Sequence, residues 1–209
     1  MKKILLFTAA LFLTLFTYDQ KQKVVSGDFS NITSIKKWKT TLDFGEPEIH
    51  KWGTYEEFIK KMMAKKDEKE EGLGEVWLKD WNSAIENDYL PKFCVLANKY
   101  LKDNKVRFIK EGDKDEDDFE GTIVIRPYWI YLGSYNPVSG VSPSKVSSKI
   151  HFYDKNGKEI LVINMIESPG GGFSTANSYG SDGAMTRMIE SFAKCGKDMA
   201  GFFAKKVYK

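Results

Sequence analysis

Residues 122–132, TIVIRPYWIYL, are apolar or aromatic at nearly every position, and the interpretation of the fold starts from them. Such a run predicts a β-strand that is covered on both faces. Pro127 cannot donate a hydrogen bond to a neighbouring strand, so we expect a bulge there or a place at the sheet edge. The sheet is therefore expected to be central to the fold, with helices covering it.

Two further strands are predicted after this run. Residues 145–153 and 158–166 are dominated by β-branched and aromatic side chains. The sequence DKNG at 154–157 predicts a tight turn between them. With residues 122–132, they predict a meander of strands in the second half of the chain.

Strands are also expected earlier in the chain. Residues 36–44 alternate between apolar and polar side chains, with Trp38 and Phe44 on the apolar face, which is typical of a half-buried strand. Another strand begins at residues 106–108. The acid-rich run 113–118 lacks the glycine and terminal glutamate of a calcium loop, so we interpret it as a solvated hairpin loop.

Two short helical segments are predicted between these strands. The sequence TYEE at 54–57 places a threonine and a glutamate three residues apart, a capping box that predicts a helix over about 55–68. The sequence WLKDW at 77–81 spaces two tryptophans four residues apart. Both rings then lie on one side of a short helix, where we expect them to be buried.

Two longer helices are also predicted. One begins at Asp88 and Pro91 and continues to about residue 102. The last helix is capped by Ser181 or Asp182. Its apolar stripe consists of Met185, Met188, Ile189, Phe192, Met199 and Phe203. The predicted class is α+β: a mixed, largely antiparallel sheet with flanking helices and a long C-terminal helix packed on the sheet.

The first residues indicate export. Lys2 and Lys3 precede the uncharged apolar run 4–16, as in a secretory signal peptide. This run is shorter than the roughly 20 apolar residues that a membrane-spanning helix needs. We therefore expect residues 1–22 to be a signal peptide and residues 23–209 to form a single α+β domain without a transmembrane helix. The expected location is the periplasm or the exterior of the cell.

The charge of the expected mature chain is balanced. The full chain has a formal net charge of +3, and residues 1–22 contain three lysines and one aspartate, so the remainder carries +1. A balanced charge gives no reason to expect nucleic acid or an anionic membrane surface as a partner.

The two cysteines, Cys94 and Cys195, allow two interpretations. In an oxidising compartment they are able to form a disulfide that closes a long loop. Alternatively, they are two buried thiols on separate helices, because each lies beside an apolar stripe and cysteine packs as a small hydrophobic residue.

The sequence predicts no catalytic, cofactor-binding or metal-binding residue. His50 and His151 fall on different elements and are too few for a zinc site, and no GxSxG motif is present. The glycine-rich stretch 168–183 runs into a helix start, yet no lysine or arginine lies between Glu167 and Thr186. We interpret this stretch as a connection between a strand and a helix.

Two loops are candidates for recognition, because binding residues often lie on loops held by a rigid sheet. The first, residues 133–145, carries Tyr135 among prolines and serines. The second is the glycine-rich stretch 168–183 with Phe173 and Tyr179. These aromatic side chains either bind a partner or fold back onto the domain.

Short motifs along the chain resemble a group of secreted proteins of unassigned role from Bacteroidetes bacteria. The motifs are LDF at 42–44, TYEEF at 54–58, WLKDW at 77–81, FxxxxN at 93–98, TIVIRPYWIYLG at 122–133, IHFYDKNGKEIL at 150–161 and AKCGKDMAGFFAKK at 193–206. Their arrangement is also similar to small periplasmic domains such as the amino-terminal domain of TolB and relatives of curli-secretion lipoproteins. The resemblance implies a fold and an envelope location.

The expected function is that of a non-catalytic binding or adaptor module in the cell envelope. Its partner would be another envelope protein or a glycan. The alternative is a hydrolase that acts on envelope glycan or peptide through a site without a recognised motif, which rests only on the supply of Asp, Glu and Ser in the chain.

Overall fold

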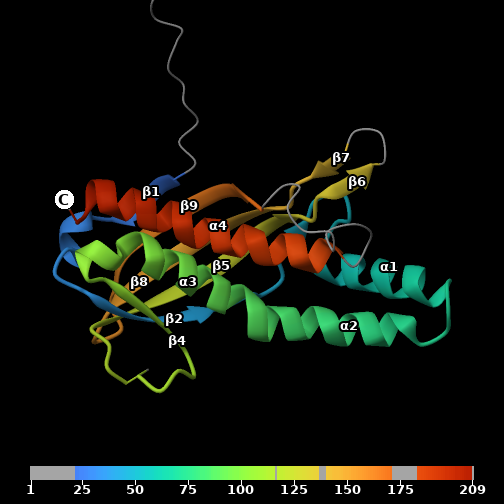
Figure 1. The fold of residues 1–209 in the computed structure, drawn as a ribbon, viewed down its shortest axis with the longest axis horizontal. Coiled ribbons are helices and arrows are strands. Elements are labelled where there is room, and N and C mark those ends of the chain that lie inside the picture. Colours follow the sequence, from blue (N-terminus) through green and yellow to red (C-terminus); the bar gives the residue numbers. More distant parts are fainter. Residues whose placement is uncertain (1–21, 116, 137–139, 171–182, 209) are drawn as a thin grey trace, which may run out of the picture.

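The computed structural model describes residues 22–115, 117–136, 140–170 and 183–208. The strands of its main sheet are β1 (Gln22–Gly27), β2 (Lys37–Leu42), β3 (Glu48–Ile49), β4 (Arg107–Lys110), β5 (Gly121–Tyr131), β8 (Lys145–Asp154) and β9 (Glu159–Pro169). Their order is β1-β9-β8-β5-β2-β4 (Figure 1). In addition, β3 pairs with β5. A separate hairpin consists of β6 (Ser134–Asn136) and β7 (Gly140–Ser142).

The meander predicted for the second half of the chain is confirmed. β5 pairs with β8 and β8 with β9, in both cases antiparallel. Between β8 and β9 the Gly157 amide donates to the carbonyl of Asp154 at 3.0 Å, and Gly157 has a φ of 81°. Glycine adopts this left-handed conformation readily, so it suits the tight turn. The register between β5 and β8 slips between Pro127 and Trp129, which confirms the expected bulge.

The connection between β4 and β5 is not the hairpin loop that was expected over residues 113–118. Both strands run parallel to β2, which lies between them: Trp38 is aligned with Phe108 on one side and Gly121 on the other. The connection therefore crosses β2 instead of reversing into a neighbouring strand. Lys37 holds it there, because its carbonyl accepts from the Glu120 amide at 2.8 Å.

The two short helices form as predicted. α1 (Tyr55–Asp67) begins with the capping box, in which Thr54 and Glu57 exchange side-chain to backbone hydrogen bonds. α2 (Leu73–Ala84) buries Trp77 and Trp81, whose rings stack at a centroid distance of 5.7 Å. Both rings pack into the main core, so the two tryptophans four residues apart are buried on one side of the helix, as expected.

The helix predicted to run to about residue 102 is confirmed as α3 (Leu90–Leu101), with Pro91 in its first turn, but it continues directly from α2 and does not begin anew at Asp88 and Pro91. A π-helical segment, Ile85–Tyr89, joins them. In a regular α-helix the ring of Pro91 would clash with the carbonyl four residues earlier. The wider turn just before Pro91 accommodates the ring, so this proline does not end the helix.

The C-terminal helix, α4 (Gly183–Lys206), packs on the sheet as predicted. Phe203 lies 5.3 Å from the ring of Phe152 in β8, and Phe152 lies 5.4 Å from Trp38 in β2. The expected caps, Ser181 and Asp182, lie outside the described residues. Among the helices in the described ranges, none combines the length and apolar character needed to cross a membrane.

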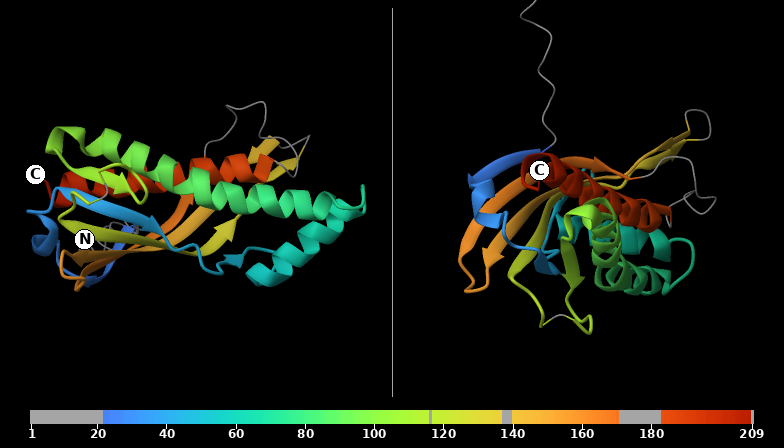
Figure 2. Two further views of the ribbon diagram at one scale, coloured as in Figure 1. Left: turned by 90° about the horizontal axis from the view of Figure 1, so that it is seen from below. Right: turned by 60° about the vertical axis from the view of Figure 1, so that its left-hand side comes forward.

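The helices gather on one side of the sheet (Figure 2). The side chains beneath them, including those of Ile123, Ile150 and Ile163, are fully buried. On the opposite side Arg126 and Tyr128 are exposed. The expectation that β5 is covered on both faces is therefore wrong, because the described helices contact only one of them.

Candidate binding surfaces

The side of the sheet away from the helices, here called the open face, is the first candidate surface. It is defined by alternate residues of the central strands: Val124, Arg126, Tyr128, Trp129 and Tyr131 of β5, Lys149, His151 and Tyr153 of β8, and Asn164 of β9. Tyr128 is 40% exposed, a large value for an aromatic residue within a sheet. The bulge in β5 places Tyr128 and Trp129 in succession on this face.

An aromatic cluster occupies one end of the open face. The amide of His50, just after β3, donates to the carbonyl of Ile130 at 2.8 Å, which fixes the histidine beside β5. Its ring lies 5.4 Å from that of Trp129 and 5.5 Å from that of Tyr131. All three rings are partly exposed, so the cluster presents both apolar surface and polar ring atoms.

Hydrogen bonds hold Tyr131 in this cluster. Its hydroxyl donates to the Ser142 hydroxyl at 3.3 Å and lies 3.4 Å from that of Ser134. These contacts, Ser134 first, lower the pKa of Tyr131. Because the serines belong to the β6–β7 hairpin, they also attach that hairpin to the main sheet.

An ion pair and a histidine–carboxylate hydrogen bond occupy the rest of the open face. Arg126 pairs with Asp43 at 2.8 Å, and the hydrogen bond to Asp43 raises the pKa of the Arg126 guanidinium. His151 contacts Glu159 through Nδ1 at 2.7 Å and stacks on Tyr153, with ring centroids 6.4 Å apart. The face therefore combines exposed rings with the Arg126–Asp43 ion pair, the His151–Glu159 hydrogen bond and the exposed Lys149.

The two histidines belong to separate clusters on this face. His50 follows β3, and His151 lies in β8, where its hydrogen bond goes to Glu159. Across the described ranges, no group of three or more His, Cys, Asp or Glu side chains could hold a metal ion. Among the residues that the structure describes, neither histidine therefore belongs to a metal-binding cluster.

The two cysteines are free thiols, which decides between the alternatives that the sequence left open. Cys94 in α3 interacts with Thr40 of β2, whereas Cys195 in α4 interacts with Ser168 of β9. Both thiols are buried, and this burial raises the pKa of each to about 12. They are protonated packing residues at neutral pH.

The recognition loops proposed from the sequence are only partly described. Tyr135 lies in β6, and the structure gives its backbone. Phe173 and Tyr179 lie outside the described residues. The open face was missed at the sequence level, because its apolar residues were attributed to a second buried side of β5.

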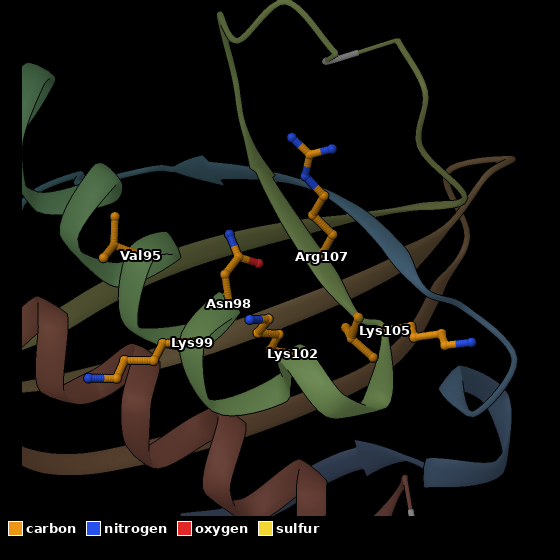
Figure 3. A pocket seen from close by; sticks show the side chains of 7 residues that line it. Val95, Asn98, Lys99, Lys102, Lys105 and Arg107 are labelled. Carbon is orange, nitrogen blue, oxygen red and sulfur yellow. The ribbon is translucent and has the colours of Figure 1, made fainter.

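A second candidate surface is a shallow pocket of about 490 Å³ between α3 and β4 (Figure 3). Its lining residues are Val95, Asn98, Lys99, Lys102, Lys105, Val106 and Arg107. The balanced overall charge concealed this local excess of cations. The sequence signal is four basic residues within positions 99–107, with only Asp103 opposing them.

Comparison of the chain with protein families, curated proteins and solved structures finds no match. The class is therefore defined by the fold itself: an α+β protein with a mixed, largely antiparallel sheet, helices on one side and an open face on the other.

Proposed function

We propose that this chain is an exported, non-catalytic binding module of the bacterial cell envelope, which recognises a protein partner through its open face. The pattern of residues 1–22 supports export, because a charged start followed by a short apolar run is typical of a signal peptide. The resemblance to secreted proteins of Bacteroidetes bacteria supports the same location.

The observation that carries the proposal is the composition of the open face. Tyr, Trp and Arg dominate the binding energy of protein interfaces, and here Arg126, Tyr128 and Trp129 lie close together on β5. A sheet holds these side chains on a rigid backbone, so little conformational entropy is lost on binding. The ion pair with Asp43 also orients Arg126 in advance.

The test compares two double variants of the mature protein in pull-downs from envelope extract. Tyr128→Ala with Lys149→Glu alters the open face, whereas Val76→Ala with Lys79→Glu makes matched changes at exposed positions of α2. All four residues are exposed, so we expect each variant to remain within about 1 kcal/mol of the wild-type free energy of unfolding.

We expect one stoichiometric protein partner to be captured by the wild type and the α2 variant, and to be lost with the open-face variant. Equal capture by both variants would show that another surface binds it. If the protein instead binds a glycan from a panel and loses this binding in the Tyr128 variant, the ligand of the open face is a saccharide and not a protein. Turnover of a glycan or peptide would instead support the hydrolase alternative.

A further inference from the structure

The pocket between α3 and β4 has a strongly one-sided charge. Lys99, Lys102, Lys105 and Arg107 line it, and none of its described lining residues is an acid. Figure 3 shows Lys102 toward the middle of the pocket, with Lys99 and Lys105 at opposite sides and Arg107 above. The pocket is open to solvent, so it would bind one end of a ligand while the rest of that ligand stays outside.

Backbone and side-chain hydrogen bonds fix the walls of this pocket. Asn98 joins α3 to β4, because its amide group donates to the Phe108 carbonyl at 2.9 Å and accepts from the Phe108 amide at 2.7 Å. Lys105 reverses the chain between the two walls with a φ of 57°. A lysine occupies a left-handed position that glycine or asparagine adopts with less strain.

The charges in the pocket do not cancel. Arg107 already pairs with Asp115 at 3.0 Å. Lys99, Lys102 and Lys105 form no ion pair with any described residue, and they leave three positive charges. The C-terminal end of α3 opposes them with about half a negative charge. With Asp103 also nearby in the sequence, the pocket keeps a net positive charge, centred on Lys102, that a ligand could neutralise.

We infer that this pocket binds a phosphate monoester group, the dianionic end of a larger molecule. Lysine ammonium groups act as point charges on flexible stems, which suits a compact phosphate with several oxygens. The guanidinium of Arg107, which would read a planar carboxylate in a bidentate manner, is engaged with Asp115. Val95, 60% exposed at the rim, offers apolar contact to the part of the ligand beyond the phosphate.

This inference is independent of the open face and of the proposed protein partner. Two sources carry the same chemistry: a soluble phosphate monoester and a phosphorylated lipid headgroup. The test therefore has two arms, which use glycerol 3-phosphate in solution and vesicles of phosphatidylcholine with or without phosphatidic acid.

In the first arm, the purified mature protein is titrated with glycerol 3-phosphate while its amide NMR spectrum is recorded. We expect saturable shifts at Lys102, Lys105 and Arg107 that weaken as salt is raised, because the attraction is electrostatic. Lys102→Gln with Lys105→Gln should weaken binding at least about tenfold. Lys60→Gln with Lys65→Gln on α1 removes the same charge elsewhere and should weaken it less than about twofold.

In the second arm, the same proteins are floated with the two kinds of vesicle. Binding only to vesicles with phosphatidic acid, lost in the pocket variant and retained in the α1 variant, identifies a lipid source. Binding only in solution identifies a soluble source. The inference is overturned if neither probe binds, or if the two double variants lose binding equally.

Discussion

Burial controls the chemistry of the two thiols at the residue scale. Desolvation raises the pKa of Cys94 and of Cys195 from 9.0 to about 12. Above about pH 9 the unfolded chain releases these protons while the folded chain retains them. The contribution of the thiols to the free energy of unfolding is therefore complete below pH 9 and is lost as the pH rises toward 12.

This linkage predicts that stability declines at alkaline pH and that the cysteines cause part of the decline. Urea unfolding at about pH 8 and about pH 10.5 measures it for the wild type and for Cys94→Ala with Cys195→Ala. We expect a smaller decline in the variant, whatever its starting stability. An equally steep decline would mean that the thiols are solvated in the folded protein.

A substitution at Phe192 tests the packing of the core. Its ring is fully buried and stacks on Tyr89, with centroids 4.7 Å apart and planes 10° apart. Phe192→Ala should lower the free energy of unfolding by about 3–5 kcal/mol, through lost burial and the cavity that remains. The exposed ring of Tyr128 is the control, since Tyr128→Ala should change stability by less than about 1 kcal/mol. A small effect at Phe192 would contradict the burial of α4 against Tyr89 in the core.

At the element scale, two glycines of α4 distinguish its two sides. A Cβ at Gly196 would lie 2.3 Å from the Phe93 carbonyl oxygen in α3, whereas a Cβ at Gly201 would meet nothing within 4 Å. Gly196→Ala should therefore destabilise the protein by about 1–3 kcal/mol, because α3 and α4 must move apart. Gly201→Ala should stabilise it by about 0.5–1 kcal/mol, because alanine favours the helix.

Thermal or urea unfolding of both variants measures this difference. Equal effects at Gly196 and Gly201 would mean that α3 and α4 are not in close contact.

Local patterns predicted most elements but not how they connect. The capping box at Thr54 and the spacing of Trp77 and Trp81 depend on neighbours within one or two helical turns, and these elements formed as expected. The crossover after β4 depends on β2, which is remote in the sequence and inserts between β4 and β5. The sequence predicted a new helix start near Pro91 because the π-helical turn before this proline, which lets the helix continue, has no simple sequence pattern.

The two candidate surfaces could not be predicted from the sequence, because each depends on how distant segments come together. Val124 and Tyr128 lie on the open face of β5. Because both are apolar or aromatic, the sequence suggested that this side of the strand is buried as well. The basic pocket arises only when α3 and β4 come together, and net charge contains no information on position.

At the scale of the whole molecule, export is the claim on which the cellular role depends. A fusion of residues 1–30 to a periplasm-dependent reporter should be exported, and amino-terminal sequencing should show a mature product that begins between residues 18 and 23. Cleavage in this interval leaves β1, which begins at Gln22, essentially complete. A native protein that begins at Met1 and stays in the cytoplasm would contradict the location.

The most direct test of the central claim is photo-crosslinking in living cells from the open face. A benzophenone-bearing side chain is placed at position 128, and in a control at position 76 of α2, since Tyr128 is 40% and Val76 55% exposed. We predict one discrete protein adduct from position 128 and none from position 76. Identical adduct patterns from both positions, or an adduct from position 76 alone, would contradict recognition through the open face.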